Sequence, residues 1–358
     1  MVSDEAQRDA FVQRLFDSIL QALEVLSVYL GDRLGLYRML AANGPMTVQE
    51  MSAAAGVDLR YAREWLEQQA AAAILDVDAT LPEDQRRFAL SPAHAEVLTD
   101  PESPYSMAPL CRSTAAIGGA LPLLLDAYRS GEGVAWDGFG NDMIEAQGDF
   151  NRPWLVGSFA TEYLPSIPDI HERLQGGARV ADIACGVGWA AISIARAYPG
   201  VRVDGFDLDE TSIVLARENA LAAGVADRVT FRAGDMAEHS DAERYDLAVV
   251  IEAIHDMSRP VEVLSSIRSM LAPSGTLIVA DEQAADAFHA PAGDVERLFY
   301  AFSILTCLPS GMLEKPSAAT GTVMRRSTFE GYASQAGFSD VSVLSIEHDF
   351  LRFYRLDP

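Results

Sequence analysis

Apolar residues recur at helical spacing along the first hundred residues of the chain. From roughly Phe11 to Leu98 there is little of the strict alternation that is typical of half-buried strands. One stripe of apolar residues, spaced as on one face of a helix, comprises Leu15, Ile19, Ala22, Leu23, Leu26 and Leu30. We therefore expect this part of the chain to be mostly helical.

A helix-turn-helix pattern follows that stripe. Thr47, with Glu50 three residues later, is typical of a capping box at the start of a helix, and Gly56 ends the helical pattern. A second helix is expected from about Leu59 to Ala73, and "FALSPAHAEVL" resembles the second strand of a small hairpin followed by a helix. This order of elements predicts a winged-helix domain over residues 1–100.

The pattern changes after a helical connector at residues 101–170. From about Ala178 onward, short apolar runs alternate with helical stretches, which is typical of a parallel sheet covered by helices on both faces. The expected strands are "RVADIA", "RVDGF", "VTFRA", "YDLAVVI" and "TLIVAD". The closing segment "FSDVSVLSIEHDFLRFYRL" holds two strand-like runs with almost no gap, so they must pair antiparallel. Residues 171–358 are therefore expected to form an α/β domain.

Charge narrows the choice of partners. The formal net charge is −25, and Lys315 is the only lysine. Such a chain repels nucleic-acid backbones and anionic lipid surfaces, so we expect neither nucleic acid nor membrane as a partner. Between Met1 and Phe150 there are 10 arginines against 23 acidic residues. The winged-helix domain is therefore expected to serve dimerisation rather than DNA binding.

The remaining composition indicates a folded protein of the cytoplasm. The N-terminus is charged, unlike a secretory signal, and no apolar run approaches the roughly 18 residues of a membrane span. Cys111, Cys185 and Cys307 lie far apart without the spacing of a metal site. We expect reduced thiols and no metal.

The first stretch that indicates a ligand-binding site is "RVADIACGVGWAA", a strand followed by a glycine turn and a helix. Gly186 and Gly188 allow a tight turn and a close approach of a ligand to the backbone. Asp207 follows Gly186 by 21 residues, where a carboxylate can accept both hydroxyls of a ribose. Asp235, followed by Met236, is suited to an adenine. The sequence "GVGWAA" also fits a dinucleotide fingerprint, but the closing hairpin and the acid after the third strand favour a nucleoside that ends at adenosine.

On these motifs, the chain from about Arg179 to the C-terminus resembles the class I S-adenosylmethionine-dependent methyltransferases. The resemblance implies a Rossmann-like, seven-stranded sheet, parallel except for a C-terminal antiparallel hairpin, and S-adenosylmethionine as cofactor. Ala184 stands where the family has a third glycine, and Trp189 where a small residue is more common. The cofactor-binding residues that it implies are Asp182, Ala184, Gly186, Gly188, Asp207, Leu208, Gly234, Asp235, Met236 and Glu252.

With a winged-helix domain in front, the chain is similar to small-molecule O-methyltransferases, and this resemblance implies catalytic residues. The stretch "IHDM" matches a motif with a histidine base, so His255 is the expected base, Asp256 its neighbour and Asp281 the acid that orients it. Glu282 is an alternative orienting acid, because a slip of one residue is open. Asp256 as a helix cap, Glu252 as a backbone partner and His255 as a structural or substrate-positioning residue also remain open.

Aromatic residues supply two candidate walls for the substrate. One set lies in the connector and the other in the long insert after the fifth strand; the expected substrate-binding residues are Trp136, Phe139, Asn151, Trp154, Phe299 and Phe302. The same residues could instead join the domains or pack against a second subunit.

Three functions are compatible with these patterns. The first is methyl transfer to a small molecule by a homodimer, with a hydroxyl group as the expected acceptor; attack by oxygen, nitrogen or carbon is left open. The second is a transcriptional regulator that senses a ligand and binds DNA through the winged-helix domain. The third is an S-adenosylmethionine-binding enzyme of non-methylating chemistry.

Overall fold

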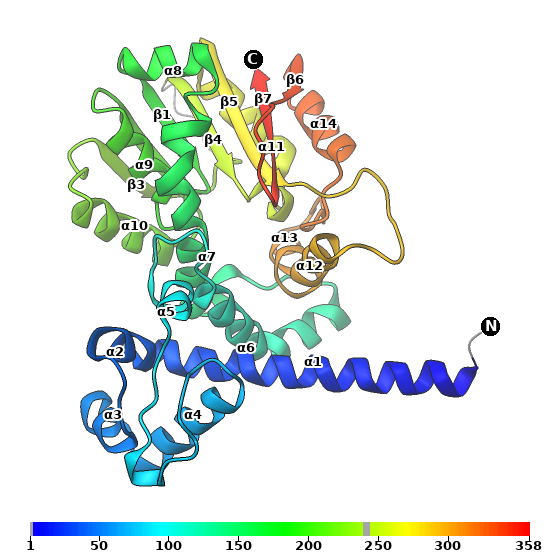
Figure 1. Ribbon diagram of the computed structural model, residues 1–358. Helices are drawn as coiled ribbons and strands as arrows, with labels where there is room; N and C mark the ends of the chain where they lie inside the picture. Colours follow the sequence, from blue (N-terminus) through cyan, green and yellow to red (C-terminus); the bar gives the residue numbers. More distant parts are fainter. Residues whose placement is uncertain (1–2, 239–243) are drawn as a thin grey trace. The chain divides into compact units, whose positions relative to one another are not determined.

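The computed structural model describes residues 3–238 and 244–358 and divides the chain into two compact units, Met1–Ala116 and Ile117–Pro358 (Figure 1).

The first unit is helical, as the sequence predicts. Thr47 and Glu50 form the expected capping box at the start of α3, and α4 ends at Ala71, two residues before the predicted end. The expected hairpin is reduced to two antiparallel bridges, Met46 with Phe88 and Asp76 with Ala89. The helices are α1 (Asp4–Arg33), α2 (Leu36–Asn43), α3 (Val48–Ala55), α4 (Leu59–Ala71) and α5 (Pro92–Thr99), with the short 3-10 turn η1 (Glu83–Gln85).

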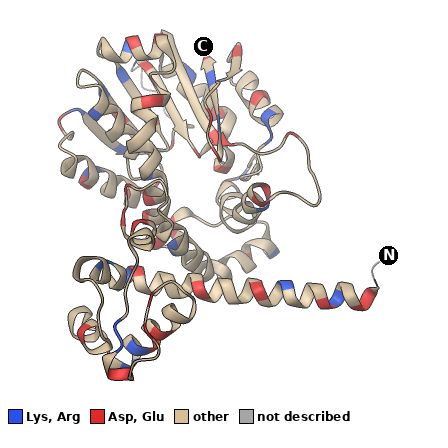
Figure 2. Ribbon diagram, in the orientation of Figure 1, with Lys and Arg blue, Asp and Glu red and all other residues tan. Residues whose placement is uncertain are grey.

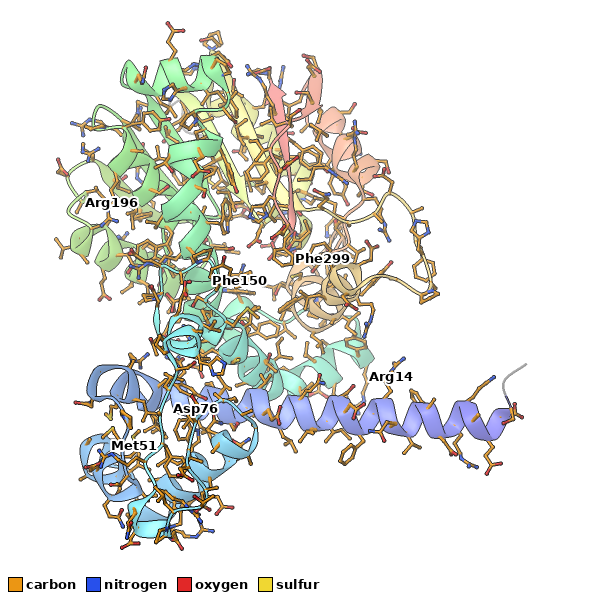
Figure 3. All side chains as sticks on the ribbon, viewed as in Figure 1. Arg14, Met51, Asp76, Phe150, Arg196 and Phe299 are labelled. Carbon is orange, nitrogen blue, oxygen red and sulfur yellow. The ribbon has the colours of Figure 1, made fainter. Side chains whose placement is uncertain are left out.

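A small aromatic core holds these helices together. Tyr37 and Trp65 pack edge to face with ring centroids 5.1 Å apart, and Met51, labelled in Figure 3, is fully buried. Gly31 of α1 lies so close to this pair that an added Cβ would come within 2.4 Å of Trp65. The C-terminal part of α1 therefore packs directly against the core of this unit.

The rest of α1 is different, because its apolar residues are exposed. Figure 3 shows its side chains, Arg14 among them, projecting along the length of the helix. The apolar residues with exposures from 40 to 62% are Phe11, Val12, Leu15, Phe16, Ile19, Leu20, Leu23, Leu26 and Leu30.

Acidic residues accompany the arginines of α4, the helix that would read DNA in a winged helix (Figure 2). Arg60 pairs with Glu64, and Arg63 pairs with Glu83. This face therefore carries paired charges rather than a basic stripe.

The second unit is built on a seven-stranded sheet in the order β3-β2-β1-β4-β5-β7-β6 (Figure 1). The first five strands are parallel, and β7 pairs antiparallel with β5 and β6, which confirms the predicted closing hairpin. The fifth strand begins at Leu271, five residues before the predicted "TLIVAD". The strands are β1 (Arg179–Ile183), β2 (Arg202–Asp207), β3 (Val229–Ala233), β4 (Tyr245–Ile251), β5 (Leu271–Glu282), β6 (Asp340–Val343) and β7 (Leu351–Asp357).

Helices cover both faces of this sheet. Alternate residues of a strand point to opposite faces, so Val249 joins one core and Val250 the other. The first core includes residues of α8 (Pro168–Gln175), α9 (Trp189–Ala197) and α10 (Glu210–Ala222); the second includes residues of α11 (Pro260–Met270) and α14 (Arg326–Gln335). The central parallel strands β1, β4 and β5 are thus buried on both faces, as their apolar runs predict, while the edge strand β3 is partly exposed.

The remaining helices come from the connector, from the turn after β4 and from the insert after β5. They are α6 (Ala108–Ser130), η2 (Trp136–Phe139), α7 (Asn141–Trp154), the π-helical η3 (Leu155–Tyr163), η4 (Ile254–Asp256), α12 (Asp294–Phe302), the π-helical η5 (Ser303–Cys307) and α13 (Leu308–Gly311). Among the described residues, α6 is the one helix long and apolar enough to cross a membrane, by length and composition alone. It contains Pro122, and Arg112 near its start forms a buried ion pair with Asp32.

Candidate active site

The glycine turn after β1 has one glycine that packing requires and one that leaves space. Gly188, with φ of +86°, precedes α9, and an added Cβ would come within 2.5 Å of the ring of Phe231. Gly186, with φ of +50°, has no atom within 4 Å of the position of such a Cβ. Gly188 is therefore needed by the fold, while Gly186 leaves the backbone open to a ligand.

Ala184 takes a left-handed conformation with φ of +55°. It stands where the family resemblance expects a glycine, and the backbone there has the shape that glycine adopts without cost. The sequence departs from the family pattern at this position, but the turn does not.

Asp207, at the end of β2, is tied to the glycine turn. Its Oδ2 accepts a hydrogen bond from the backbone N–H of Gly186 at 2.7 Å, and its Oδ1 accepts one from Asp209 at 2.9 Å. Each carboxylate oxygen can accept a further bond. Burial raises the pKa of this carboxyl.

Asp182 lies deeper and supports the helix. It is 2% exposed, and its Oδ2 accepts the N–H of Ala191 in the first turn of α9 at 3.0 Å. Burial raises its pKa to about 7. The carboxyl therefore positions α9 against β1.

The acid after β3 is already partly engaged. Asp235 accepts the N–H of Ala237 at 2.8 Å and pairs through its other oxygen with Arg259. Met236 is buried in the second core, whereas Leu208, next to Asp207, is 60% exposed. Gly234 leaves open space. The remaining acceptor capacity of the Asp207 carboxylate, an exposed leucine and open glycines fit an adenosine.

Glu252 follows β4 in a strained conformation with φ of +49°. Its N–H bonds the carbonyl of Ala280 at 2.8 Å, and its Oε2 accepts the side-chain amides of Gln147 and Asn151. Asn151 in turn accepts the Nε1–H of Trp154 at 3.0 Å. Burial raises the pKa of Glu252.

The sequence motifs did not reveal Gln147 or Arg259 as partners of these acids. A signal for Gln147 exists, because Gln147 and Asn151 stand four residues apart and therefore share one face of α7. What no pattern reveals is that this face meets Glu252, more than a hundred residues later.

His255 lies in the short turn η4 after β4 and is only 2% exposed. Its Nδ1 is 2.9 Å from Oδ1 of Asp281 and 2.8 Å from Oε2 of Glu282. The structure thus brings the expected orienting acid and its alternative to the same ring nitrogen. No hydrogen bond to Nε2 is formed by any described residue. His255 is therefore held at one nitrogen and available at the other.

The electrostatics of this group follow from burial and from the two acids. Burial by itself lowers the pKa of His255, but Glu282 and Asp281 outweigh burial and raise that pKa well above its ordinary value. Burial raises the pKa of Asp256 to about 7. The imidazole is therefore a stronger base than a free histidine.

Atoms of His255, Asp281 and Glu282 lie within 4.8 Å of one another, which is close enough to consider a metal ion. Ligand atoms about 2.1 Å from a tetrahedral zinc ion would lie about 3.4 Å apart. Nδ1 is nearer than that to both carboxylate oxygens, at 2.9 and 2.8 Å. Of the two contacts, the one with Asp281 is a hydrogen bond.

The expected substrate residues lie on several elements of the second unit. Trp136 and Phe139 of η2 contact each other with centroids 6.0 Å apart, and Phe139 is buried. Phe299 of α12, labelled in Figure 3, is also buried, and Phe302 ends that helix half-buried. The ring of Trp154 lies 5.2–6.4 Å from those of Phe159, Tyr163, His348 and Phe353. Trp154 therefore packs within this unit against β7.

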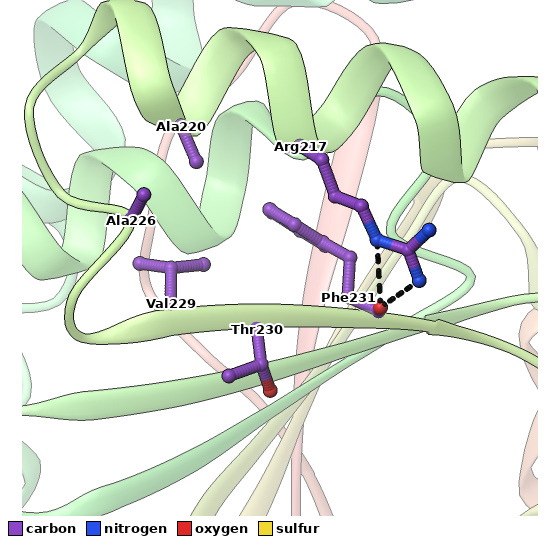
Figure 4. Close-up of a pocket in the computed structure, with 6 residues that line it drawn as sticks. All are labelled: Arg217, Ala220, Ala226, Val229, Thr230 and Phe231. Atoms are coloured by element: carbon purple, nitrogen blue, oxygen red, sulfur yellow. Dashed lines mark hydrogen bonds between the residues drawn. The ribbon is translucent and has the colours of Figure 1, made fainter.

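A surface pocket of about 250 Å³ lies elsewhere, between α10 and the edge strand β3 (Figure 4). Arg217 lines this pocket, and its guanidinium group donates two hydrogen bonds to the carbonyl of Phe231. The pocket is lined by Arg217, Ala220, Ala226, Val229, Thr230 and Phe231, none of which is a predicted site residue.

Comparison with known proteins bears on both units. Residues 174–307 match a family model described as a methyltransferase domain, and residues 22–100 match an Rv2258c-like winged HTH domain. Among curated relatives, 27-O-demethylrifamycin SV methyltransferase of Amycolatopsis mediterranei is 34% identical over 110 residues, 30% of this chain and 40% of the relative. Ubiquinone biosynthesis O-methyltransferase of Bordetella avium is 34% identical over 111 residues, 30% of this chain and 44% of the relative. The chain thus matches less than half the length of these relatives.

Solved structures share the fold over the whole chain. The mitomycin 7-O-methyltransferase MmcR is 22% identical with a TM-score of 0.68, covering 99% of each chain. Human N-acetylserotonin methyltransferase, solved in complex with SAM, is 18% identical with a TM-score of 0.69, covering 100% of this chain and 99% of that one. The chain therefore carries a class I S-adenosylmethionine-dependent methyltransferase domain behind an N-terminal winged-helix domain.

Proposed function

We propose that this protein transfers the methyl group of S-adenosylmethionine to a hydroxyl group of a small molecule, with His255 as general base. The observation that carries the proposal is a buried histidine, held through Nδ1 by carboxylates and free at Nε2 among the described residues, beside an adenosine-type site at the same end of the sheet. In parallel α/β sheets, ligands bind at this end.

S-adenosylmethionine supplies a methyl group already activated by its positive sulfur. The residues of the chain have two tasks, to align the acceptor and to take its proton. Alignment can contribute roughly 7–11 kcal/mol where the geometry is ideal. As the acceptor oxygen attacks, its proton moves to Nε2 of His255, and Asp281 stabilises the imidazolium that results.

The cofactor-binding residues of this proposal are those around the glycine turn. Gly186 and Gly234 leave the backbone accessible, Asp207 would accept the ribose hydroxyls, and the exposed Leu208 would pack against the adenine. Asp235 and Met236 complete the adenine side, although Asp235 shares its carboxylate with Arg259.

A direct test combines calorimetry with mass spectrometry. We expect the purified protein to bind S-adenosylmethionine, and to transfer a trideuterated methyl from the labelled cofactor to a member of a panel of hydroxylated aromatic compounds. If the protein shows no affinity for S-adenosylmethionine, the proposal fails.

The two glycines of the turn give a matched pair of variants. Gly188→Ala should destabilise the protein by about 2–5 kcal/mol, because it combines a left-handed conformation with overpacking against Phe231. Gly186→Ala should cost only about 1–2 kcal/mol, since no atom lies near the new methyl, yet it should weaken cofactor binding. Thermal unfolding and calorimetry measure the two effects. Equal stability losses would contradict this assignment.

We further propose that α1 joins a second copy of the chain, so that the protein is a homodimer, and that the winged-helix domain serves this assembly rather than DNA. Exposed apolar residues follow one another at intervals of four and three along α1, the spacing of a coiled-coil seam: Val12, Phe16, Ile19, Leu23, Leu26 and Leu30. The paired charges on α4 support the same division of roles. The proposal also places the protein in the cytoplasm.

Leu23→Glu should weaken the dimer by about 30-fold or more, because it places an unpaired charge in the seam. Light scattering after size-exclusion chromatography measures the change. The control is Gln21→Glu, which adds the same charge at an exposed position of α1 outside the seam. A Leu23→Glu protein that remains dimeric would rule out α1 as the interface.

A further inference from the structure

Two carboxylates compete for one proton donor beside His255. Nδ1 carries a single proton, yet oxygens of Asp281 and Glu282 lie 2.9 and 2.8 Å from it. One N–H cannot donate a well-aligned hydrogen bond to both. Oδ2 of Asp281 and Oε2 of Glu282 are buried, and neither has a hydrogen-bond partner of good geometry among the described residues. The hydrogen-bonding capacity of these two buried oxygens is therefore unmet by the described residues.

The two acids are not equivalent. Oδ1 of Asp281 accepts two hydrogen bonds, from Nδ1 of His255 and from the backbone N–H of Glu282 at 3.0 Å. No backbone donor to the Glu282 carboxyl is found in the described parts of the chain. Hydrogen bonds to a carboxylate favour its charged form, so Asp281 is the better anion.

Two negative charges this close in a buried site cannot both persist. The distances are too short for a metal ion shared by these groups. Resting on the proposed function of His255 as base, we propose that Asp281 and Glu282 share one proton, held mainly by Glu282, so that Glu282 is a second positioning residue for the base.

This arrangement resolves the unpaired oxygens. A protonated Glu282 can donate its O–H to Oδ2 of Asp281, which gives each of these atoms a partner. The direction of the pKa shifts agrees: burial raises the pKa of Glu282 to about 8, whereas His255 overcomes burial and lowers that of Asp281.

The shared proton also sets the charge that the site must bury. With the proton, the pair carries one negative charge, which is neutralised when His255 takes the proton of the acceptor. The other groups that act on this cluster are Glu252 after β4, Asp256 in η4, Cys307 of η5 and Tyr354 of β7. All of them are acids, so an unprotonated Glu282 would add a further negative charge to an acidic surrounding.

The test compares Glu282→Gln with Asp281→Asn in the full-length protein. The histidine side chains are labelled with nitrogen-15, and the signal of His255 is assigned by its loss in His255→Ala. Because glutamine resembles a protonated glutamate, Glu282→Gln should move the titration midpoint of His255 by less than about 0.5 pH unit. An ionised Glu282 would instead be the acid that raises the pKa of His255 most, and its loss would lower the midpoint clearly. Asp281→Asn should lower it by about 1 pH unit or more, because it removes the anion beside Nδ1. Equal downward shifts would overturn the proposal.

Infrared spectroscopy gives a second readout that does not depend on the Asp281 variant. At pH 7 the difference between wild type and Glu282→Gln should contain the band of a protonated carboxyl. A carboxylate band in its place would show that Glu282 is ionised and would reject the shared proton. Zinc binding by chelator-treated protein, lost in both variants, would show that a cation rather than a proton lies between the two carboxyl groups, and it would reject the proposal. These measurements need neither cofactor nor acceptor, so they are independent of the test of methyl transfer.

Discussion

Replacing His255 by alanine is expected to lower the turnover of methyl transfer by about 100-fold or more, while the affinity for S-adenosylmethionine stays close to that of the wild type. The physical reason is that the acceptor loses the group that removes its proton, an effect of about 10²–10⁴ in rate for a positioned base. The cofactor site keeps Asp207 and the glycine turn, which do not depend on the imidazole. Turnover under saturating cofactor and calorimetric titration measure the two quantities.

The control for this variant is His255→Gln, which keeps a polar side chain of similar length but has no basic nitrogen. It should be as slow as His255→Ala. If either variant turns over nearly as fast as the wild type, alignment of the acceptor suffices and the histidine has a structural or positioning role.

The pH dependence of the same reaction follows from the raised pKa of His255. A base acts in its deprotonated form, so a raised pKa moves the rise of activity toward higher pH. We expect the turnover to increase with pH through neutrality rather than to level off near pH 6.5. A profile that is flat from pH 6 to pH 9 would argue against histidine as the group that titrates.

Replacing Asp207 by alanine is expected to weaken the binding of S-adenosylmethionine by about 10- to 150-fold. The estimate corresponds to the loss of hydrogen bonds to a charged acceptor, about 1.5–3 kcal/mol. The same carboxylate holds the N–H of Gly186, so its removal also loosens the glycine turn. Calorimetry with S-adenosylmethionine and with S-adenosylhomocysteine should show the same loss, because both carry the ribose.

Two further variants separate these contributions. Asp207→Asn keeps the size of the side chain and should lose affinity to a smaller extent. Glu210→Ala removes a nearby exposed acid at the start of α10 and should leave binding unchanged. Unchanged affinity in Asp207→Ala would refute the placement of the cofactor.

Local sequence patterns predicted much of the fold. Val229–Ala233 and Tyr245–Ile251 have the predicted boundaries. Tyr245–Ile251 holds the continuous apolar run that is typical of a strand buried on both faces, whereas Val229–Ala233 is the edge strand and exposes Thr230 and Arg232. The capping box at Thr47 was predicted because all of its atoms come from four consecutive residues. The predicted hairpin of the winged helix was reduced to isolated bridges, because pairing between strands depends on distant partners.

The candidate site was predicted in part. The glycine turn and Asp207 could be found because each follows the end of a predicted strand, whereas His255 was singled out by the resemblance of "IHDM" to a family motif. The spacing could not choose between Asp281 and Glu282 as the partner of His255, and the structure brings an oxygen of each to the same nitrogen. Their roles as catalytic residues stay a prediction until the variants above are measured.

The sequence by itself determined the order of helices and strands, the acidic charge and the place of the glycine turn, because these depend on neighbouring residues. Only the tertiary structure decided which side chains meet: Glu252 with the amides of α7, and His255 with two acids 26 and 27 residues later. Such contacts arise when the packing of the sheet and its helices brings distant segments together. The geometry of the acids beside Nδ1, and with it the place of the shared proton, is therefore a property of the folded chain.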